Sequence, residues 1–213
     1  MSALEELQKC PRDLRLIDGH DIAELAIAAL GCVVAFQALR LEIAGLVAGF
    51  WCLCVVIIRS DLKHFIIPNW ATAGIAVLGL AYAVFSTPGA ITHLSAILAA
   101  LGGPIERAVL TLLGVAGFSW AFARIIGREC LGFGDVKLSG ALAIWLGPYD
   151  LLLTLEVACL AALGLVAIRA LRDRRTFNDG VIPFGAFLAP AAWLVFMSYS
   201  LSAMLGPWHA LFG

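Results

Sequence analysis

Two aspartates stand out in a chain that carries few charges. Asp61 lies in the segment RSDLK (59–63), directly after a long apolar stretch, and Asp135 ends the motif GFGD (132–135). Two carboxyls held close together cannot both ionise cheaply, so they share a proton and titrate as a coupled pair. The charged member can deprotonate a water while the protonated member donates to a scissile carbonyl. If the fold brings them together, the pair predicts aspartic hydrolysis of a peptide bond.

The composition of the chain places these aspartates in a membrane protein. Of 213 residues, 62% are hydrophobic and 14% are charged, and the mean hydropathy is +0.97. Soluble globular domains are about half apolar and about a quarter charged, so we expect no soluble module. Because a membrane span needs about 20 apolar residues, we expect an all-α polytopic bundle of about seven transmembrane helices, near 22–39, 43–60, 68–86, 105–126, 136–147, 151–168 and 181–205.

The distribution of basic residues fixes the expected orientation. With the N-terminus inside, only Arg40 and Arg107 of the 14 basic residues fall on the outer side, as the positive-inside tendency requires. Residues 88–103 are then expected outside as an interfacial or re-entrant helix. The mixed charge of the first 21 residues predicts a retained cytoplasmic segment, followed by one transmembrane domain (22–205) and a short tail (206–213). Both aspartates would then share the inner membrane face.

Helix ends near the aspartates should influence how they ionise. Gly132 and Gly134 are expected to allow a sharp turn through positive φ and close backbone approach. Asp135 would then lie at the N-cap or first turn of a helix, where the dipole favours its anion, and Asp61 at a helix C-terminal end, where the dipole disfavours it. The dipoles favour Asp61 as the protonated partner, but roughly 0.3–1 kcal/mol is too small to fix the assignment.

The segments around both aspartates resemble those of the type IV prepilin peptidase family, which are membrane aspartic proteases of the GxGD type. In that family a first catalytic aspartate precedes an Ile-Pro-Asn segment, and a second ends Gly-x-Gly-Asp and is followed by a lysine. Asp61 with IPN (67–69), and GFGD with the lysine at 137, match these patterns, and PFG (183–185) matches a further family segment. The resemblance covers about residues 43–190. It implies catalytic Asp61 and Asp135, supported by Gly132, Gly134, Lys137, Pro68 and Asn69.

This resemblance implies an endopeptidase that removes the short basic leader of a type IV prepilin at the cytoplasmic face of the bacterial inner membrane. The hydrophobic helix of the prepilin would stay in the lipid bilayer, against the spans near the two aspartates. We expect no cofactor, no metal and no nucleic-acid partner. The six cysteines form no CxxC pair, unlike the zinc motifs of larger members, so the chain resembles the compact, peptidase-only branch that serves Flp (tight-adherence) pili.

Three alternatives stay open at this point: a small membrane transporter, a scaffold of a secretion apparatus, and an archaeal preflagellin peptidase. A transporter usually shows internal repeats, which are not evident here. Among the remaining polar residues, Lys137 could steady the charge near Asp135, hold a substrate carbonyl or snorkel to the interface. Asn69 could bond across the site or only start a helix. His64 and Glu156 are expected at membrane interfaces, and the six tryptophans are expected as interfacial anchors.

Overall fold

The computed structural model describes residues 19–127, 131–172 and 182–205. Within these ranges the chain forms no strand. It forms helices α2 (Gly19–Ala38), α3 (Leu41–His64), α4 (Asn69–Ser86), η2 (Ala90–Thr92), α5 (Leu94–Ile126), α6 (Phe133–Trp145), α7 (Pro148–Arg172) and α8 (Gly185–Leu205). The prediction of an all-α membrane helix bundle is confirmed.

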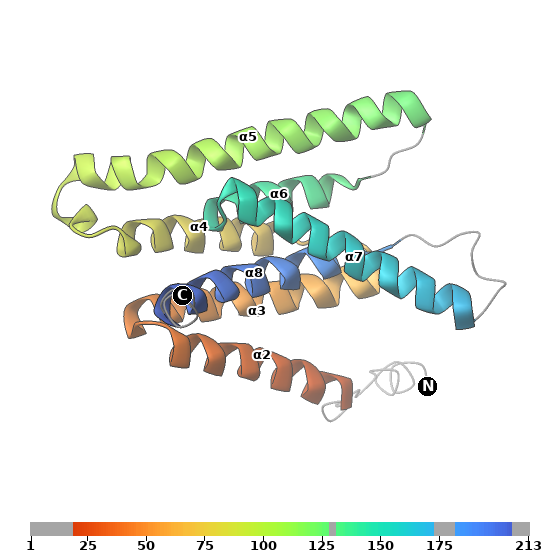
Figure 1. Cartoon of the computed structure of the whole chain (residues 1–213), viewed down its shortest axis with the longest axis horizontal. Helices are drawn as coiled ribbons and strands as arrows, with labels where there is room; N and C mark the ends of the chain where they lie inside the picture. The colour runs from red at the N-terminus through yellow and green to blue at the C-terminus, as the bar shows by residue number, and fades with distance from the viewer. Residues whose placement is uncertain (1–18, 128–130, 173–181, 206–213) are drawn as a thin grey trace, which may run out of the picture.

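Successive helices alternate in direction, as Figure 1 shows. The C-terminal ends of α3, α5 and α7 and the N-terminal ends of α4, α6 and α8 therefore lie at one end of the bundle, on the right of Figure 1. We call this the aspartate end, because α3 brings Asp61 there and α6 brings Asp135. The expectation that both acids share one end of the bundle is met by the helix order.

The helices differ in how much of a membrane they can cross. Four carry stretches long and apolar enough to span it, at 43–64, 69–86, 94–125 and 148–168. The apolar stretches of α2 (23–37) and α8 (185–200) are shorter. Helix α6 has 13 residues, or about 20 Å at 1.5 Å per residue, against a hydrocarbon core of about 30 Å. The site helix α6 therefore reaches through only part of the bilayer.

The expected separate helix at 88–103 is wrong. After the short η2, residues from Leu94 onward belong to α5, a single helix of 33 residues that contains Pro104. Proline removes one backbone donor and commonly ends helices in water, but membrane helices tolerate it because neighbouring groups satisfy the freed backbone. Arg107 of α5 donates to the carbonyls of Ala143 (3.2 Å) and Ile144 (3.3 Å) in the last turn of α6. Helix α5 thereby caps the short helix α6.

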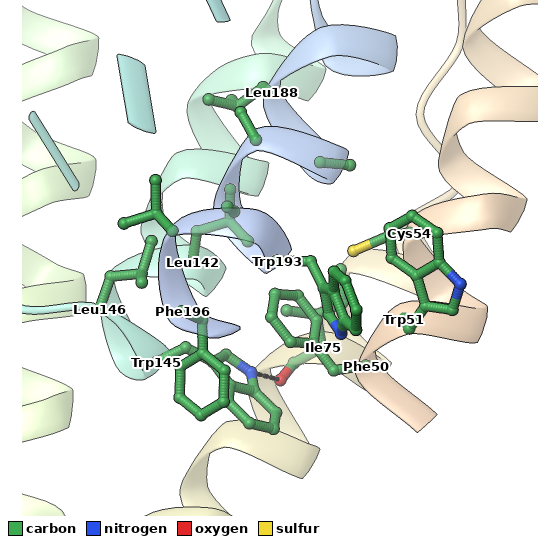
Figure 2. Close-up of a cluster of buried hydrophobic side chains, with 14 of the residues drawn as sticks. Phe50, Trp51, Cys54, Ile75, Leu142, Trp145, Leu146, Leu188, Trp193 and Phe196 are labelled. Atoms are coloured by element: carbon green, nitrogen blue, oxygen red, sulfur yellow. Dashed lines mark hydrogen bonds between the residues drawn. The ribbon is translucent and has the colours of Figure 1, made fainter. Parts of the chain in front are cut away.

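An aromatic cluster holds together the helices that carry the site. The rings of Phe50 in α3 and Trp145 in α6 stack with centroids 4.5 Å apart, and Phe196 in α8 meets Trp145 edge-on at 5.4 Å. The indole N–H of Trp145 donates to the carbonyl of Ile75 in α4 at 2.8 Å, the bond drawn in Figure 2. One side chain thus ties α3, α4, α6 and α8 together.

The tryptophans do not all serve as interfacial anchors, so that expectation is wrong for three of them. Trp51, Trp145 and Trp193 are only 5–8% exposed and lie in the core, because the junction of several helices leaves room that large rings fill. Trp70 and Trp120 are exposed, as expected. The sixth tryptophan lies outside the described residues.

Candidate active site

Asp61 lies in the last turn of α3 with a buried side chain. Its Oδ2 accepts the backbone N–H of Ala186 at 2.8 Å, in the first turn of α8. The first N–H groups of a helix have no acceptor within the helix, and the positive end of the helix dipole stabilises an anion placed there. Asp61 therefore caps the N-terminus of a helix that follows it far along the chain.

Asp135 lies in the first turn of α6, whose N-cap is Gly132. Its Oδ1 is buried and has no hydrogen-bond partner among the described residues. Asp135 precedes the apolar stretch 136–147. Burial, and after it the negative charge of Asp61, raise the pKa of the Asp135 carboxyl to about 6, while a backbone hydrogen bond from Gly132 opposes the shift. The two carboxyls thus lie close enough for the charge of one to act on the other.

The direct contacts of the two carboxyls act against the preference that the dipoles of α3 and α6 gave. The C-terminal end of α3 disfavours an anion at Asp61, but the N–H of Ala186 and the positive end of α8 favour one. A hydrogen bond to a charged group contributes about 1.5–3 kcal/mol, more than the roughly 0.3–1 kcal/mol of a helix dipole. Asp135 has an unpartnered oxygen and a negative neighbour, and these contacts favour a proton on Asp135. The sequence could not show this because the contact comes from a distant helix.

Two glycines let α6 and α8 approach the connection between α3 and α4. A Cβ on Gly134 would lie 3.3 Å from the Cβ of Ile67, tighter than most real contacts. A Cβ on Gly185 would lie 2.6 Å from Ile67 Cδ1 and 3.1 Å from Asp61 Oδ2. The side chain of Ile67 therefore fills the space between the starts of α6 and α8, beside Asp61.

The expected use of positive φ at the GFGD motif is wrong. Gly132 has φ −66° and ψ 146°, and Gly134 already belongs to α6. Close backbone approach, the other expected role, applies to Gly134 through its contact with Ile67. The turn needs no left-handed residue because an extended N-cap is the ordinary way to enter a helix.

The connection between α3 and α4 involves Phe65 and Ser60, which the sequence did not single out, and Pro68, which it did. Phe65 adopts the left-handed conformation (φ 53°, ψ 33°), and its N–H donates to the carbonyl of Asp61 at 2.9 Å. The Ser60 hydroxyl donates to the carbonyl of Ile66 at 2.7 Å. Pro68 then forms the N-cap of α4. A bulky residue with positive φ is uncommon and marks strain that tends to gather at functional sites; no sequence signal indicated it at Phe65.

Lys137 and Asn69 form a second polar contact near the aspartates. The Lys137 Nζ donates to Asn69 Oδ1 at 3.0 Å and lies 4.5 Å from the centroid of the Phe133 ring. Asn69 therefore bonds to a residue of α6 and also begins α4, so each of its two expected roles describes part of what the structure shows. The Lys137 ammonium contacts the first residue of α4.

The remaining polar candidates lie apart from this contact. His64, at the end of α3, and Glu156, in α7, are exposed. In the part of the chain that the structure describes, no group of three or more His, Cys, Asp or Glu side chains could hold a metal ion. Cys10 and Cys130 lie outside that part.

The family comparison agrees with this geometry. Residues 46–167, more than half of the chain, match the model of the type IV leader peptidase family. The chain belongs to that family. The matched region contains both Asp61 and Asp135. It ends before α8, the helix that contributes Ala186. Neither the transporter nor the scaffold alternative predicts such a match.

Individual relatives support the same assignment. Among them are proteins named prepilin leader peptidase/N-methyltransferase. The protein of Dichelobacter nodosus is 30% identical over 176 residues, which cover 83% of this chain and 56% of the relative. The protein of Pseudomonas aeruginosa is 28% identical over 179 residues, covering 84% and 58%. The chain thus spans a little over half the length of these curated relatives. No solved structure matches the chain.

Proposed function

We propose that this leader peptidase family member is an aspartic endopeptidase that removes the short basic leader of a type IV prepilin, with Asp61 and Asp135 as its catalytic carboxyls. The observation that carries the proposal is that two acids from distant helices come together at one end of the bundle in unequal surroundings. Asp61 accepts the N–H of Ala186, whereas Asp135 has an unpartnered, buried oxygen. Such inequality is what separates a general base from a general acid.

Several features support the finer parts of the proposal. The relatives from Dichelobacter nodosus and Pseudomonas aeruginosa carry the name prepilin leader peptidase, which supports a prepilin substrate. A Flp-type prepilin is the substrate that the resemblance to the compact branch implies. Basic side chains at the aspartate end, among them Arg59, Lys63 and Arg124, support an orientation in which this end faces the cytoplasm.

The reaction follows from the two protonation states. The Asp61 carboxylate takes a proton from a water, whose oxygen forms a bond to the scissile carbonyl carbon, while Asp135 gives its proton to the carbonyl oxygen. In the resulting tetrahedral intermediate, Asp61 returns its proton to the leaving nitrogen and the C–N bond breaks. One hydroxyl proton of the intermediate goes back to Asp135, so that a carboxylic acid is released. One water is consumed and both acids regain their starting states.

The test is leader removal from a co-expressed Flp-type prepilin by wild type, Asp61→Asn and Asp135→Asn, with membrane insertion measured in parallel. Asparagine keeps the shape of the side chain but cannot exchange the proton. Either substitution is expected to block leader removal at unchanged insertion. Asp150→Asn is the matched control, because Asp150 lies in the first turn of α7 at the opposite end of the bundle. Normal processing by Asp61→Asn or Asp135→Asn would contradict the proposal.

A further inference from the structure

A groove continues from the aspartate end between α4, α5 and α6. It has a volume of about 350 Å³, and its lining is mainly apolar. Asn69 and Lys137 line one end of it, and Ala76, Ala108 and Ile144 line the other. Along both α4 and α6 this covers roughly two helical turns, or about 10 Å. The groove therefore runs from the aspartate end toward the middle of the bundle.

The groove stays accessible because α5 packs closely on α6 but much less on α4. None of the residues in the most apolar window of α5 is buried, and in Figure 1 this helix lies at the edge of the bundle, beside α6. Leu112 of α5 packs onto Gly140 of α6, while Ala73 on the α4 wall is exposed. The wall of α4 at Ala73 is thus left open to the surrounding lipid.

The lining suits one face of an apolar helix. Between helices in lipid there is no hydrophobic driving force, so association depends on close packing, which small residues permit. Ala73, Ala76 and Ala108 line the walls, and Gly140 and Ala141 are buried at the floor. Only the end near Asp135 is polar, where Lys137 and Asn69 meet. A chain entering here would keep its polar junction at the aspartates and its apolar part in the groove.

We propose that this groove holds the apolar helix of the prepilin, with the residues that follow the scissile bond entering at Lys137 and Asn69. The inference rests on the proposed function and adds the surface that positions the substrate. Its position supports this occupant: Lys137 and Asn69 line the end of the groove that lies at the same end of the bundle as Asp61 and Asp135, and the groove leads from there toward the middle of the bundle. The basic leader then stays outside the groove, at the aspartate end.

Photo-crosslinking locates the occupant directly. The photoreactive residue p-benzoylphenylalanine is placed at Ala73 or Ala108, on the two walls, in membranes that contain a tagged Flp-type prepilin. Leu110 is the matched control, because it lies two residues from Ala108 on the same helix, is 61% exposed and does not line the groove. Adducts between the two wall positions and the apolar helix of the prepilin are expected in several-fold excess over Leu110. Adducts to lipid or to a second copy of the chain, in place of the prepilin, would overturn the proposal.

A kinetic experiment separates the groove from the chemistry. Ala108→Trp fills the groove and is expected to raise the KM for a full-length prepilin about tenfold, equivalent to about 1.4 kcal/mol. Cleavage of a short peptide that spans only the leader junction is expected to stay unchanged, as are both substrates with Leu110→Trp. A normal KM for the full-length prepilin in Ala108→Trp would overturn the proposal that the groove binds the substrate. It would leave the proposed peptidase function intact. Failure of the wild type to cleave either substrate would instead overturn the proposed function.

Discussion

Helices α6 and α7 begin in nearly the same way, at opposite ends of the bundle. Asp135 lies in the first turn of α6, and its carbonyl accepts the Ser139 hydroxyl at 2.8 Å. Asp150 lies in the first turn of α7, and its carbonyl accepts the Thr154 hydroxyl at 2.7 Å. Both hydroxyl side chains are buried. As local structures, the two helix starts are close to interchangeable.

The glycines of the two helix starts match as well. A Cβ on Gly132 would lie 3.4 Å from Asp135 Oδ2, and a Cβ on Gly147 would lie 3.2 Å from Asp150 Oδ2. The two helix starts differ in their neighbouring residues. The start of α6 lies at the end of the bundle that also holds Asp61 of α3 and Ala186 of α8. A glycine followed by a first-turn aspartate is therefore an ordinary helix start, and a second carboxyl from another helix makes it a candidate site.

Among the changes that test this comparison, the largest effect is expected from breaking the contact that α8 adds to this end. Gly185→Val would place its side chain against Ile67 and Asp61 Oδ2, since a Cβ there lies 3.1 Å from that oxygen. Displacing the carboxylate from the Ala186 N–H is expected to lower kcat about 100-fold, or about 2.7 kcal/mol. The measurement is the rate of leader release in proteoliposomes. Gly164→Val is the control, because nothing lies within 4 Å of a Cβ at Gly164. Equal rates in both variants would show that the Asp61 contact is not needed.

A smaller effect should appear in the dependence of the rate on pH. The pKa of Asp135 is raised from 3.8 to about 6, so Asp135 keeps its proton to higher pH than an ordinary carboxyl. If the protonated form is the acid, kcat should fall about tenfold per pH unit above that value. The profile is measured with purified enzyme on both sides of pH 6. A rate that stays constant well above pH 6 would contradict this role for Asp135.

The smallest effect is expected from removing each of the two buried hydroxyls. Ser139→Ala and Thr154→Val each remove one hydrogen bond to the carbonyl of a first-turn aspartate, which contributes about 0.5–1.5 kcal/mol to folding. Similar losses of thermal stability are expected in both variants. Only Ser139→Ala should also slow leader release, by a few-fold, because Ser139 helps to hold the turn that carries Asp135. A comparable slowing by Thr154→Val would indicate a general loss of folding instead.

Much of the fold followed from the sequence because each membrane helix must bury an apolar stretch of limited length. The segment 88–103 was misjudged because the basic residues placed it outside as a separate helix, whereas the residues from Leu94 onward continue through Pro104 as part of α5. Trp145 was misjudged because hydropathy does not say which side of a helix faces the core. Both errors concern how helices pack, which a single amino-acid sequence specifies only weakly.

The candidate site followed from the sequence in part. Asp61 and Asp135 could be paired because the order of the spans sends both to one face, and IPN (67–69) flagged the connection that holds Ile67. The Ala186 contact could not be foreseen, although PFG (183–185) marked the place. Nothing signalled the left-handed Phe65, because a phenylalanine carries no preference for that conformation.

The most direct test of the account is whether the two carboxyls act as one unit. The measurement is kcat/KM for a prepilin with purified wild type, Asp61→Asn, Asp135→Asn and the double variant. Each single change is expected to lower kcat/KM by about 10³-fold or more, and the double variant to be no worse than the poorer single one, because residues that act together are strongly non-additive. Losses that multiply in the double variant would show independent roles and contradict a shared proton.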